Sequence, residues 1–385
     1  ACTEIFERLA YYLGRSLILI FVTASVATGG LGLSDTVAAN MQSNLTAFSY
    51  LLPLFGAVIV DKYIGARYTT PVGMFIAAAG YFTGGIAKSS VGVYAMIFLV
   101  SLGLALFKNG AIIGRVITDK SQMDPAFSMR YTLVNVGAFI GTFLVGILYK
   151  DVFAKNGVLG FAPCFKMAAL MMVLGGLWYI FVCWRFLGDL GKLPFKKTLT
   201  EEEKAAEAKK KEETGTKQPL TTIEKKRIGA IFVASLFSIV FWIFWYLGYM
   251  PVYFYWAENM DWVVAGYQVP STWFDAANSL FCVILGPVTA ALWKKLAARP
   301  QGDMSLFRKT GLGIAIIGVG YLFYAAIDIM RGGEKASVLW LIVFAFLLTM
   351  GEMFFSPLGH SFISKYSPSR YLAVMMSVWG FATFI

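Results

Sequence analysis

The feature that most restricts the fold is a series of apolar stretches, each long enough for a membrane-spanning helix of ~20 residues. Ten complete stretches lie at about 3–30, 42–62, 70–88, 91–116, 128–150, 163–187, 228–256, 271–296, 307–330 and 336–363. An eleventh begins near residue 370 and reaches the last residue, so we expect a twelfth beyond it. Backbone polar groups in a bilayer core must bond within their own segment, which favours helices. The sequence therefore predicts an all-α polytopic membrane protein.

Composition agrees with this interpretation. Of the 385 residues, 58% are hydrophobic and 14% are charged, whereas soluble proteins carry about 25% charged residues. The net charge of +11 comes mostly from short loops after the even-numbered stretches. Basic loops stay on the cytoplasmic side, so they predict an inner (plasma) membrane protein with a cytoplasmic N-terminus. They do not indicate nucleic-acid binding.

Few residues could support enzyme chemistry. The four cysteines are scattered without metal-ligand spacing, and the single histidine, His360, cannot build a metal site. We find no nucleophile–base pair and no Gly-rich phosphate loop. We therefore expect no enzymatic activity, no metal and no cofactor.

The segment 188–227 is the one long polar stretch, and we interpret it as a cytoplasmic linker between two helical bundles, 1–187 and 228–385. Thr200 and Glu203 fit a capping box, which predicts a short surface helix at about 201–213. A faint repeat of the Gly56–Arg67 segment at Gly286–Arg299 supports two parallel halves. A regulatory or lipid-contacting role for the linker is the alternative.

The first predicted helix carries a stripe of ionisable residues along an otherwise apolar surface. Spacings of three and four residues place them on one face; they are Glu4, Glu7, Arg8, Tyr11, Tyr12 and Arg15. An ionised side chain at the bilayer centre costs ~2.5–3.5 kcal/mol on insertion scales. Such a stripe should face a water-filled cavity or paired charges, and it marks a functional site.

Two further charges stand alone within apolar stretches. Lys108 lies in the fourth stretch and Glu352 in the tenth. Because each alone would be costly in a membrane, we expect them to pair or to share the cavity of the N-terminal stripe. The alternative is that each side chain extends to an interface. A third set of charges, Asp61 and Arg67, lies in the Gly-rich loop after the second stretch and can pair on the cytoplasmic side.

Several motifs together resemble the proton-coupled oligopeptide transporters, a branch of the major facilitator superfamily. The motifs are Glu4-x-x-Glu7-Arg8-x-x-Tyr11-Tyr12, Tyr50 with Asp61, Lys108, Asn135-Val136-Gly137-Ala138-Phe139, Ser271-Thr272-Trp273-Phe274 with Asn278, Gly351-Glu352-x3-Ser356-Pro357-x-Gly359 and Met375-Met376-Ser377-Val378-Trp379. The resemblance runs from the first stretch to the end of the chain. It implies two six-helix bundles that transport di- and tripeptides together with protons, in a protein that acts as a monomer.

The resemblance also implies residue roles. Glu4, Glu7, Arg8 and Glu352 would couple the proton. Arg8 and Lys108 would bind the peptide carboxylate, and the amino end would be bound by Glu352, Asn135 and Asn278. The remaining substrate contacts would come from Tyr11, Tyr12, Tyr50, Ser356 and Trp379. The gating residues would be Arg15, Asp61, Arg67 and Lys108.

Two positions depart from the family pattern. Tyr246 and Leu247 stand where members usually have an acid and an amide, and Lys108-Asn109-Gly110 replaces a Lys-Pro-Asn. The first change puts the substrate range in doubt. A symporter of another small anion or zwitterion (nitrate, a modified amino acid or a drug) and a non-transporting sensor therefore stay as alternatives. Because the seventh stretch lacks its usual acid, the partner of Arg15 would be Glu258, Asp261 or no acid at all.

Overall fold

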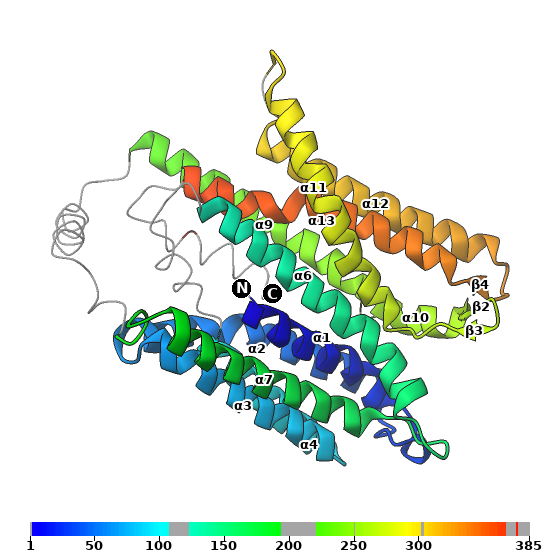
Figure 1. Ribbon diagram of the computed structural model, residues 1–385. Coiled ribbons are helices and arrows are strands. Elements are labelled where there is room, and N and C mark those ends of the chain that lie inside the picture. Colours follow the sequence, from blue (N-terminus) through cyan, green and yellow to red (C-terminus); the bar gives the residue numbers. More distant parts are fainter. Residues whose placement is uncertain are drawn as a thin grey trace. The chain divides into compact units, whose positions relative to one another are not determined.

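Figure 1 shows the computed structural model, which describes residues 2–107, 123–193, 221–249, 251–301, 304–366 and 375. The chain forms two compact units. Unit 1 contains Ala1–Thr198 and Trp262–Val283, and unit 2 contains Leu199–Asp261 and Ile284–Ile385. The described elements are almost all helices, as the sequence predicts.

The described part of unit 1 contains six long helices. They are α1 (Cys2–Thr23), α2 (Asp35–Lys62), α3 (Ala66–Ile86), α4 (Ser90–Phe107), α6 (Met123–Ile147) and α7 (Phe161–Phe186). Short elements complete it: the 3-10 turn η1 (Val26–Thr28), the π-helical turn η3 (Leu148–Val152), the hairpin of β2 (Val263–Val264) with β3 (Tyr267–Gln268), and the start of α11 (Trp273–Ala297). The long helices match the first six predicted stretches.

The first helix ends earlier than predicted. The apolar stretch was expected to continue to about residue 30, but α1 stops at Thr23 and the chain turns through η1. Gly29 closes this turn at a φ of 89°, a left-handed conformation that glycine adopts without steric cost. A Cβ on Gly30 would lie 2.2 Å from the carbonyl oxygen of Ala24. The glycines therefore build a tight turn instead of extending the helix.

Glycines also let α6 approach α1 closely. A Cβ on Gly141 would lie 2.6 Å from the carbonyl oxygen of Leu9, and one on Gly137 would lie 2.9 Å from that of Ile5. Small residues are typical of close helix contacts in membranes, where packing and not the hydrophobic effect drives association. This contact determines which α1 residues face α6.

Replacing Gly141 with Val is expected to lower the free energy of unfolding by about 1–3 kcal/mol, because the larger side chain would overpack the α1–α6 contact. The thermal unfolding temperature of the detergent-solubilised protein measures the effect. Gly318→Val is the matched control, since a Cβ at Gly318 meets nothing within 4 Å. Equal unfolding temperatures for the two variants would contradict the close approach.

Unit 2 contains α9 (Thr222–Tyr249), α10 (Pro251–Asn259), the rest of α11, α12 (Leu306–Met330) and α13 (Leu339–Tyr366). The strands β1 (Met260–Asp261) and β4 (Ala336–Ser337) pair in parallel. Close contact of α12 with α13 again uses glycine: a Cβ on Gly313 would lie 2.8 Å from the carbonyl oxygen of Gly351.

The predicted seventh stretch is two helices. The first, α9, starts earlier than predicted because Thr221 and Glu224 form a capping box, in which the Glu224 N–H donates to Thr221 Oγ1 at 3.2 Å. The second, α10, begins at Pro251, a residue that suits the first helical position. The predicted surface helix at 201–213 lies outside the described residues, and so does the eleventh stretch apart from Met375.

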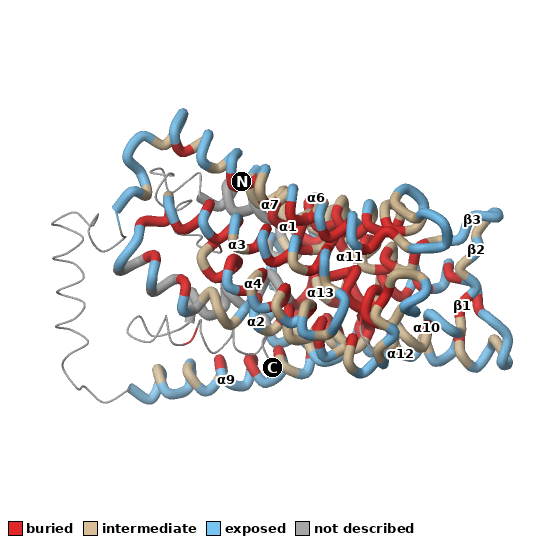
Figure 2. Tube along the Cα trace, turned by 90° about the horizontal axis from the view of Figure 1, so that it is seen from below, coloured by how far each residue is buried: buried red, intermediate tan, exposed pale blue. Residues whose placement is uncertain are grey.

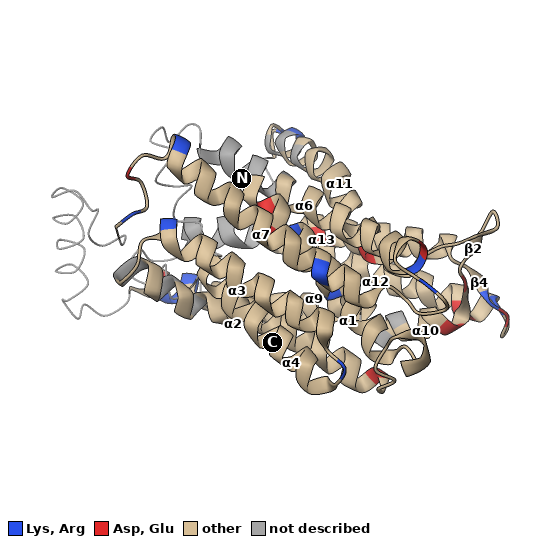
Figure 3. Cartoon of the chain, turned by 60° about the horizontal axis from the view of Figure 1, so that its bottom comes forward, with Lys and Arg blue, Asp and Glu red and all other residues tan. Residues whose placement is uncertain are grey.

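The described helices have membrane character. Six segments are long and apolar enough to cross a bilayer: 90–107, 133–152, 161–186, 222–259, 273–293 and 307–330. Exposed residues run along much of α9 (Figure 2), and they include the large apolar side chains of Phe232, Leu236 and Ile243. Most charged residues lie near helix ends and in loops, with long uncharged stretches between them (Figure 3). Such apolar surfaces fit contact with lipid.

Candidate functional site

The centre of the N-terminal stripe is a buried ion pair between Glu7 and Arg8 on α1. Glu7 is completely buried and Arg8 is 9% exposed. The Arg8 Nε donates to Glu7 Oε2, and Arg8 Nη2 donates to Glu7 Oε1 at 2.5 Å. Two parallel hydrogen bonds of this kind hold a guanidinium and a carboxylate strongly and directionally. The pair therefore neutralises two charges that would each be costly in an apolar environment.

Aromatic rings flank the Arg8 guanidinium. Its central carbon lies 4.9 Å from the ring centroid of Tyr11 and 6.0 Å from that of Tyr12. The two rings stand at 89° to each other with centroids 5.4 Å apart. A cation over an aromatic face is attracted by the ring. The rings of Tyr11 and Tyr12 thus hold Arg8 in place without neutralising its charge.

Other predicted site residues of unit 1 lie on α1, α2 and α6. Glu4 is half-buried and acts electrostatically on Arg8. Tyr50 of α2 is 45% exposed and lies near enough to Tyr12 to interact with it electrostatically. Asn135 is half-buried on α6, the helix that packs against α1. These three residues therefore belong to the same part of the molecule as the Glu7–Arg8 pair.

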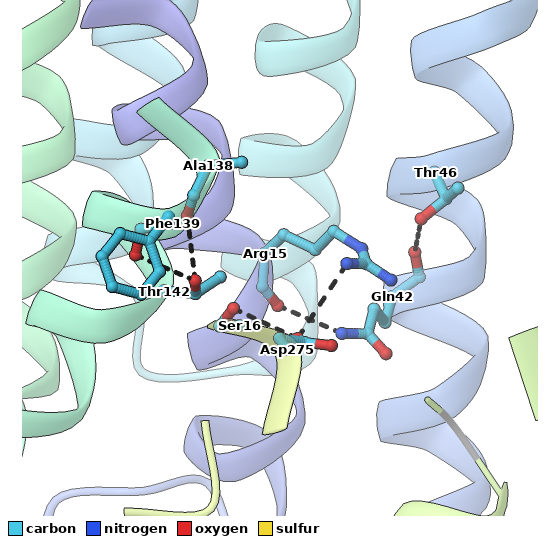
Figure 4. Close-up of polar contacts among 8 residues, drawn as sticks. All are labelled: Arg15, Ser16, Gln42, Thr46, Ala138, Phe139, Thr142 and Asp275. Atoms are coloured by element: carbon cyan, nitrogen blue, oxygen red, sulfur yellow. Dashed lines mark hydrogen bonds and ion pairs between the residues drawn. The ribbon is translucent and has the colours of Figure 1, made fainter. Parts of the chain in front are cut away.

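The last residue of the stripe has a partner that differs from those the sequence suggested. Arg15 Nη1 lies 4.0 Å from Asp275 Oδ2, at the start of α11 (Figure 4). Glu258 and Asp261, the acids proposed from the sequence, lie in α10 and β1 of unit 2. Those acids were chosen because they follow the seventh stretch. The structure shows that the acid comes from the eighth.

Two neutral side chains bond to the residues of this second ion pair. Ser16 Oγ donates to Asp275 Oδ2 at 3.3 Å. Gln42 Nε2, from α2, donates to the carbonyl oxygen of Arg15 at 3.3 Å. Figure 4 shows Arg15 and Ser16 meeting Asp275 at the start of α11, with Gln42 bonded to the backbone of Arg15. The ion pair thus joins α1 to the start of α11, and the Gln42 hydrogen bond joins α2 to α1.

In unit 2, the predicted site residue Glu352 contacts an aromatic surface. The Trp245 Nε1–H donates to Glu352 Oε2 at 3.1 Å. The surface is the face of α9 formed by Trp242, Trp245, Tyr246 and Tyr249, whose neighbouring rings have centroids 4.5–5.9 Å apart. Positions three and four apart share a helix face. Tyr246, which stands where family members usually have an acid, therefore belongs to this aromatic face. Glu352 is half-buried beside this surface.

Some predicted residues cannot be placed against their partners. Lys108 and Trp379 lie outside the described residues, so the predicted pairing of Lys108 with Glu352 stays a prediction. Ser356 lies in α13 and Asp61 in the last turn of α2, and only their backbones are described. Asn278 is half-buried on α11 within unit 1.

Arg67 contacts the end of another helix. It donates from Nη1 to the carbonyl oxygen of Gly188, and from Nη2 to that of Cys183 at 2.9 Å. These carbonyls lie at the C-terminal end of α7, where a cation is favourable. Just beyond, Lys192 donates to Asp189, and this hydrogen bond holds the pKa of the Asp189 carboxyl below its ordinary value. Arg67 lies in the first turn of α3, so it fixes the start of α3 to the end of α7.

Sequence reasoning missed two residues of this site, Asp275 and Trp245. Asp275 is the only acid of the stretch 271–296, so the argument that singled out Lys108 and Glu352 would also have found it. Trp245 had no comparable signal, because one tryptophan in a helix rich in aromatic residues does not stand out. No group of three or more potential metal ligands occurs among the described residues.

Comparisons with known proteins agree with this architecture. A model of the POT family matches residues 190–385. The di-/tripeptide transporter of Lactococcus lactis subsp. cremoris is 25% identical over 433 residues, which cover 99% of this chain and 85% of that protein. The crystal structure of the peptide transporter POT in complex with sulfate matches with a TM-score of 0.87 at 24% identity. The match covers 100% of this chain and 85% of that chain.

A second solved structure, that of tetrameric PepTSo2, has a TM-score of 0.79 at 21% identity and covers 100% of this chain and 85% of that chain. These likenesses show that the chain has the major facilitator superfamily fold, as the sequence predicted.

Proposed function

The chain belongs to the POT family, and on that premise we propose that it is a proton-coupled symporter of di- and tripeptides. It would work by alternating access in the inner (plasma) membrane, with its N-terminus in the cytoplasm. The observation that carries the proposal is the buried, doubly hydrogen-bonded pair of Glu7 and Arg8 beside Tyr11. The similarity to a relative named di-/tripeptide transporter supports the substrate class.

Charge balance at this pair suggests how a proton and a peptide are coupled. With Glu7 ionised, Arg8 is neutralised by its neighbour. A proton on Glu7 removes that partner, and Arg8 then needs another anion in an apolar environment. The carboxylate of a peptide supplies one. Proton binding and peptide binding therefore favour each other, which is the reciprocity that symport needs.

The amino end of the peptide would bind in unit 2, with Glu352 as the carboxylate and Asn135 and Asn278 of unit 1 as additional partners. Tyr11, Tyr12, Tyr50, Ser356 and Trp379 would complete the pocket. Broad selectivity follows from aromatic contacts, which accept many side chains. Lys108 would assist Arg8, and Arg15, Asp61, Arg67 and Lys108 would act in gating.

We further propose bundles at 1–187 and 228–385 joined by the linker 188–227, a chain that acts as a monomer, and no enzymatic activity. The alternative cargo, another small anion or zwitterion, is favoured by the aromatic face of α9, where Tyr246 replaces the usual acid.

Proteoliposomes that contain the protein are expected to concentrate labelled dialanine when an inward proton gradient is imposed. A gradient of about one pH unit is worth ~1.4 kcal/mol, which for one coupled proton supports about tenfold accumulation. A protonophore should reduce the signal to simple equilibration. Failure to take up any di- or tripeptide, with or without the gradient, would overturn the proposal, and direct uptake of labelled nitrate or amino acids would then test the alternative.

A further inference from the structure

A cluster of contacts holds the start of α11, and the hairpin before it, against the helices of unit 1. Besides the Arg15–Asp275 pair, Trp273 Nε1–H donates to the carbonyl oxygen of Phe143 at 3.1 Å, and the two rings stack with centroids 4.6 Å apart. Lys150 Nζ donates to the carbonyl oxygen of Gln268 at 2.8 Å. In the proposed topology this cluster lies on the outer side of the membrane, and we call it the outer latch.

Within the outer latch, this ion pair is the contact between two charged side chains that the described residues show, and both side chains are mostly shielded from solvent. The side chain of Arg15 is 6% exposed and that of Asp275 is 19% exposed. The pair has a single contact at 4.0 Å, unlike the double hydrogen bond of Glu7 with Arg8. Opening the latch while Asp275 is ionised would leave a carboxylate in an apolar environment without its cation, which is strongly unfavourable.

We propose that Asp275 is a second proton-binding residue of the symporter and that its protonation from the outer side releases Arg15 and opens the outer latch. This inference rests on the proposed symport. A proton from outer water adds to the Asp275 carboxylate, which becomes a neutral carboxylic acid. Ser16 still provides a hydrogen bond to the neutral acid. When Arg15 returns, its positive charge favours the ionised carboxylate again, and the proton passes to water that reaches the site from the cytoplasmic side.

The surroundings of Asp275 make it the responsive group of the outer latch. From α1, Arg15 and Ser16 act on its carboxylate, and α2 contributes the neutral amide of Gln42 to the same cluster. From η3, Lys150 is bound to the hairpin, and Asp151 accepts a hydrogen bond from the Tyr267 hydroxyl at 3.0 Å. That hydrogen bond lies at an exposed site, where loss of one charge changes stability little.

Accessibility of a buried latch residue tests the proposal. Thr272 is 4% exposed, and Thr272→Cys would report opening through its reaction with a membrane-impermeant maleimide. Thiol reactivity itself depends on pH, so labelling is normalised at each pH to Val263→Cys, a position that is 51% exposed. The parent protein without either substitution gives the background. Normalised labelling should rise by up to about tenfold for each unit by which the outer pH falls, since one unit is worth ~1.4 kcal/mol per proton.

Asp275→Asn mimics the neutral acid. In this variant, labelling of Thr272→Cys is expected to be high at both pH values, and gradient-driven dialanine uptake should fall about tenfold more than counterflow. Asp151→Asn is the matched control, and it should retain the pH response. The response of the parent Thr272→Cys protein tests the proposal even if Asp275→Asn does not fold.

Two results would overturn the proposal: labelling in the parent that does not change with outer pH, or the parental pH response retained in Asp275→Asn. Dialanine uptake is measured on the same preparations, which separates this inference from the proposed function. Uptake with pH-independent labelling rejects the role of Asp275 alone. A pH-dependent latch without uptake of any peptide supports the role of Asp275 and rejects peptide symport.

Discussion

Glu7→Gln is expected to abolish proton-driven accumulation of dialanine while leaving peptide counterflow measurable. Glu7 is completely buried and its carboxylate is the doubly bonded partner of Arg8. Glutamine keeps the size of the side chain and one oxygen that can accept from Arg8, but it cannot exchange a proton. Arg8 then behaves as if Glu7 were permanently protonated, so a peptide carboxylate can still bind and exchange.

Accumulation ratio and counterflow are both measured in proteoliposomes, and the gradient-driven ratio should fall to that of equilibration. Removing one partner of a buried pair can cost about 3–5 kcal/mol, so loss of folding must be distinguished from loss of coupling. Retained counterflow makes that distinction. Glu334→Gln, at an exposed loop position, is the control and should transport normally. If Glu7→Gln still concentrates peptide, proton coupling belongs to another residue.

The positions of the helices were predictable because apolar length is a local property of the sequence. The stretches predicted at 163–187 and 307–330 correspond to α7 (Phe161–Phe186) and α12 (Leu306–Met330). The ends were less predictable where local turn chemistry decides them. After α1 ends at Thr23 the chain turns through η1, a turn that Gly29 and Gly30 make possible. Hydropathy does not distinguish such a turn from a continued helix.

Partners of the charged residues were predictable only in part. The stripe argument placed Glu7 and Arg8 on one helix face, yet adjacent residues point in different directions and need not meet. Their double hydrogen bond depends on the conformations of both side chains. Arg15 was harder, because its partner Asp275 is far away in the sequence. Choosing among distant acids requires knowing that the start of α11 lies beside α1, which one sequence does not show.

Replacing Glu352 with Gln is expected to lower kcat/KM for dialanine about 100-fold, because the peptide ammonium would lose a partly buried carboxylate partner worth ~2–5 kcal/mol. One neighbour of Glu352 is Trp245, whose indole N–H donates to the carboxylate at 3.1 Å. Glutamine offers a carbonyl oxygen to the same donor. The substitution therefore removes mainly the charge, and the loss of activity measures how far that charge acts on the substrate.

N-acetyl-dialanine separates binding of the amino end from a general effect on transport. It has no ammonium, so its inhibition constant against labelled dialanine should exceed that of unlabelled dialanine about 100-fold in the parent. In Glu352→Gln this ratio should approach one. Trp245→Phe keeps a ring on α9 and removes the hydrogen-bond donor, and it should weaken uptake about tenfold, since a hydrogen bond to a charged group is worth about 1.5–3 kcal/mol. A ratio unchanged in Glu352→Gln would mean that this carboxylate does not bind the amino end, and that the aromatic face of α9 serves a different cargo.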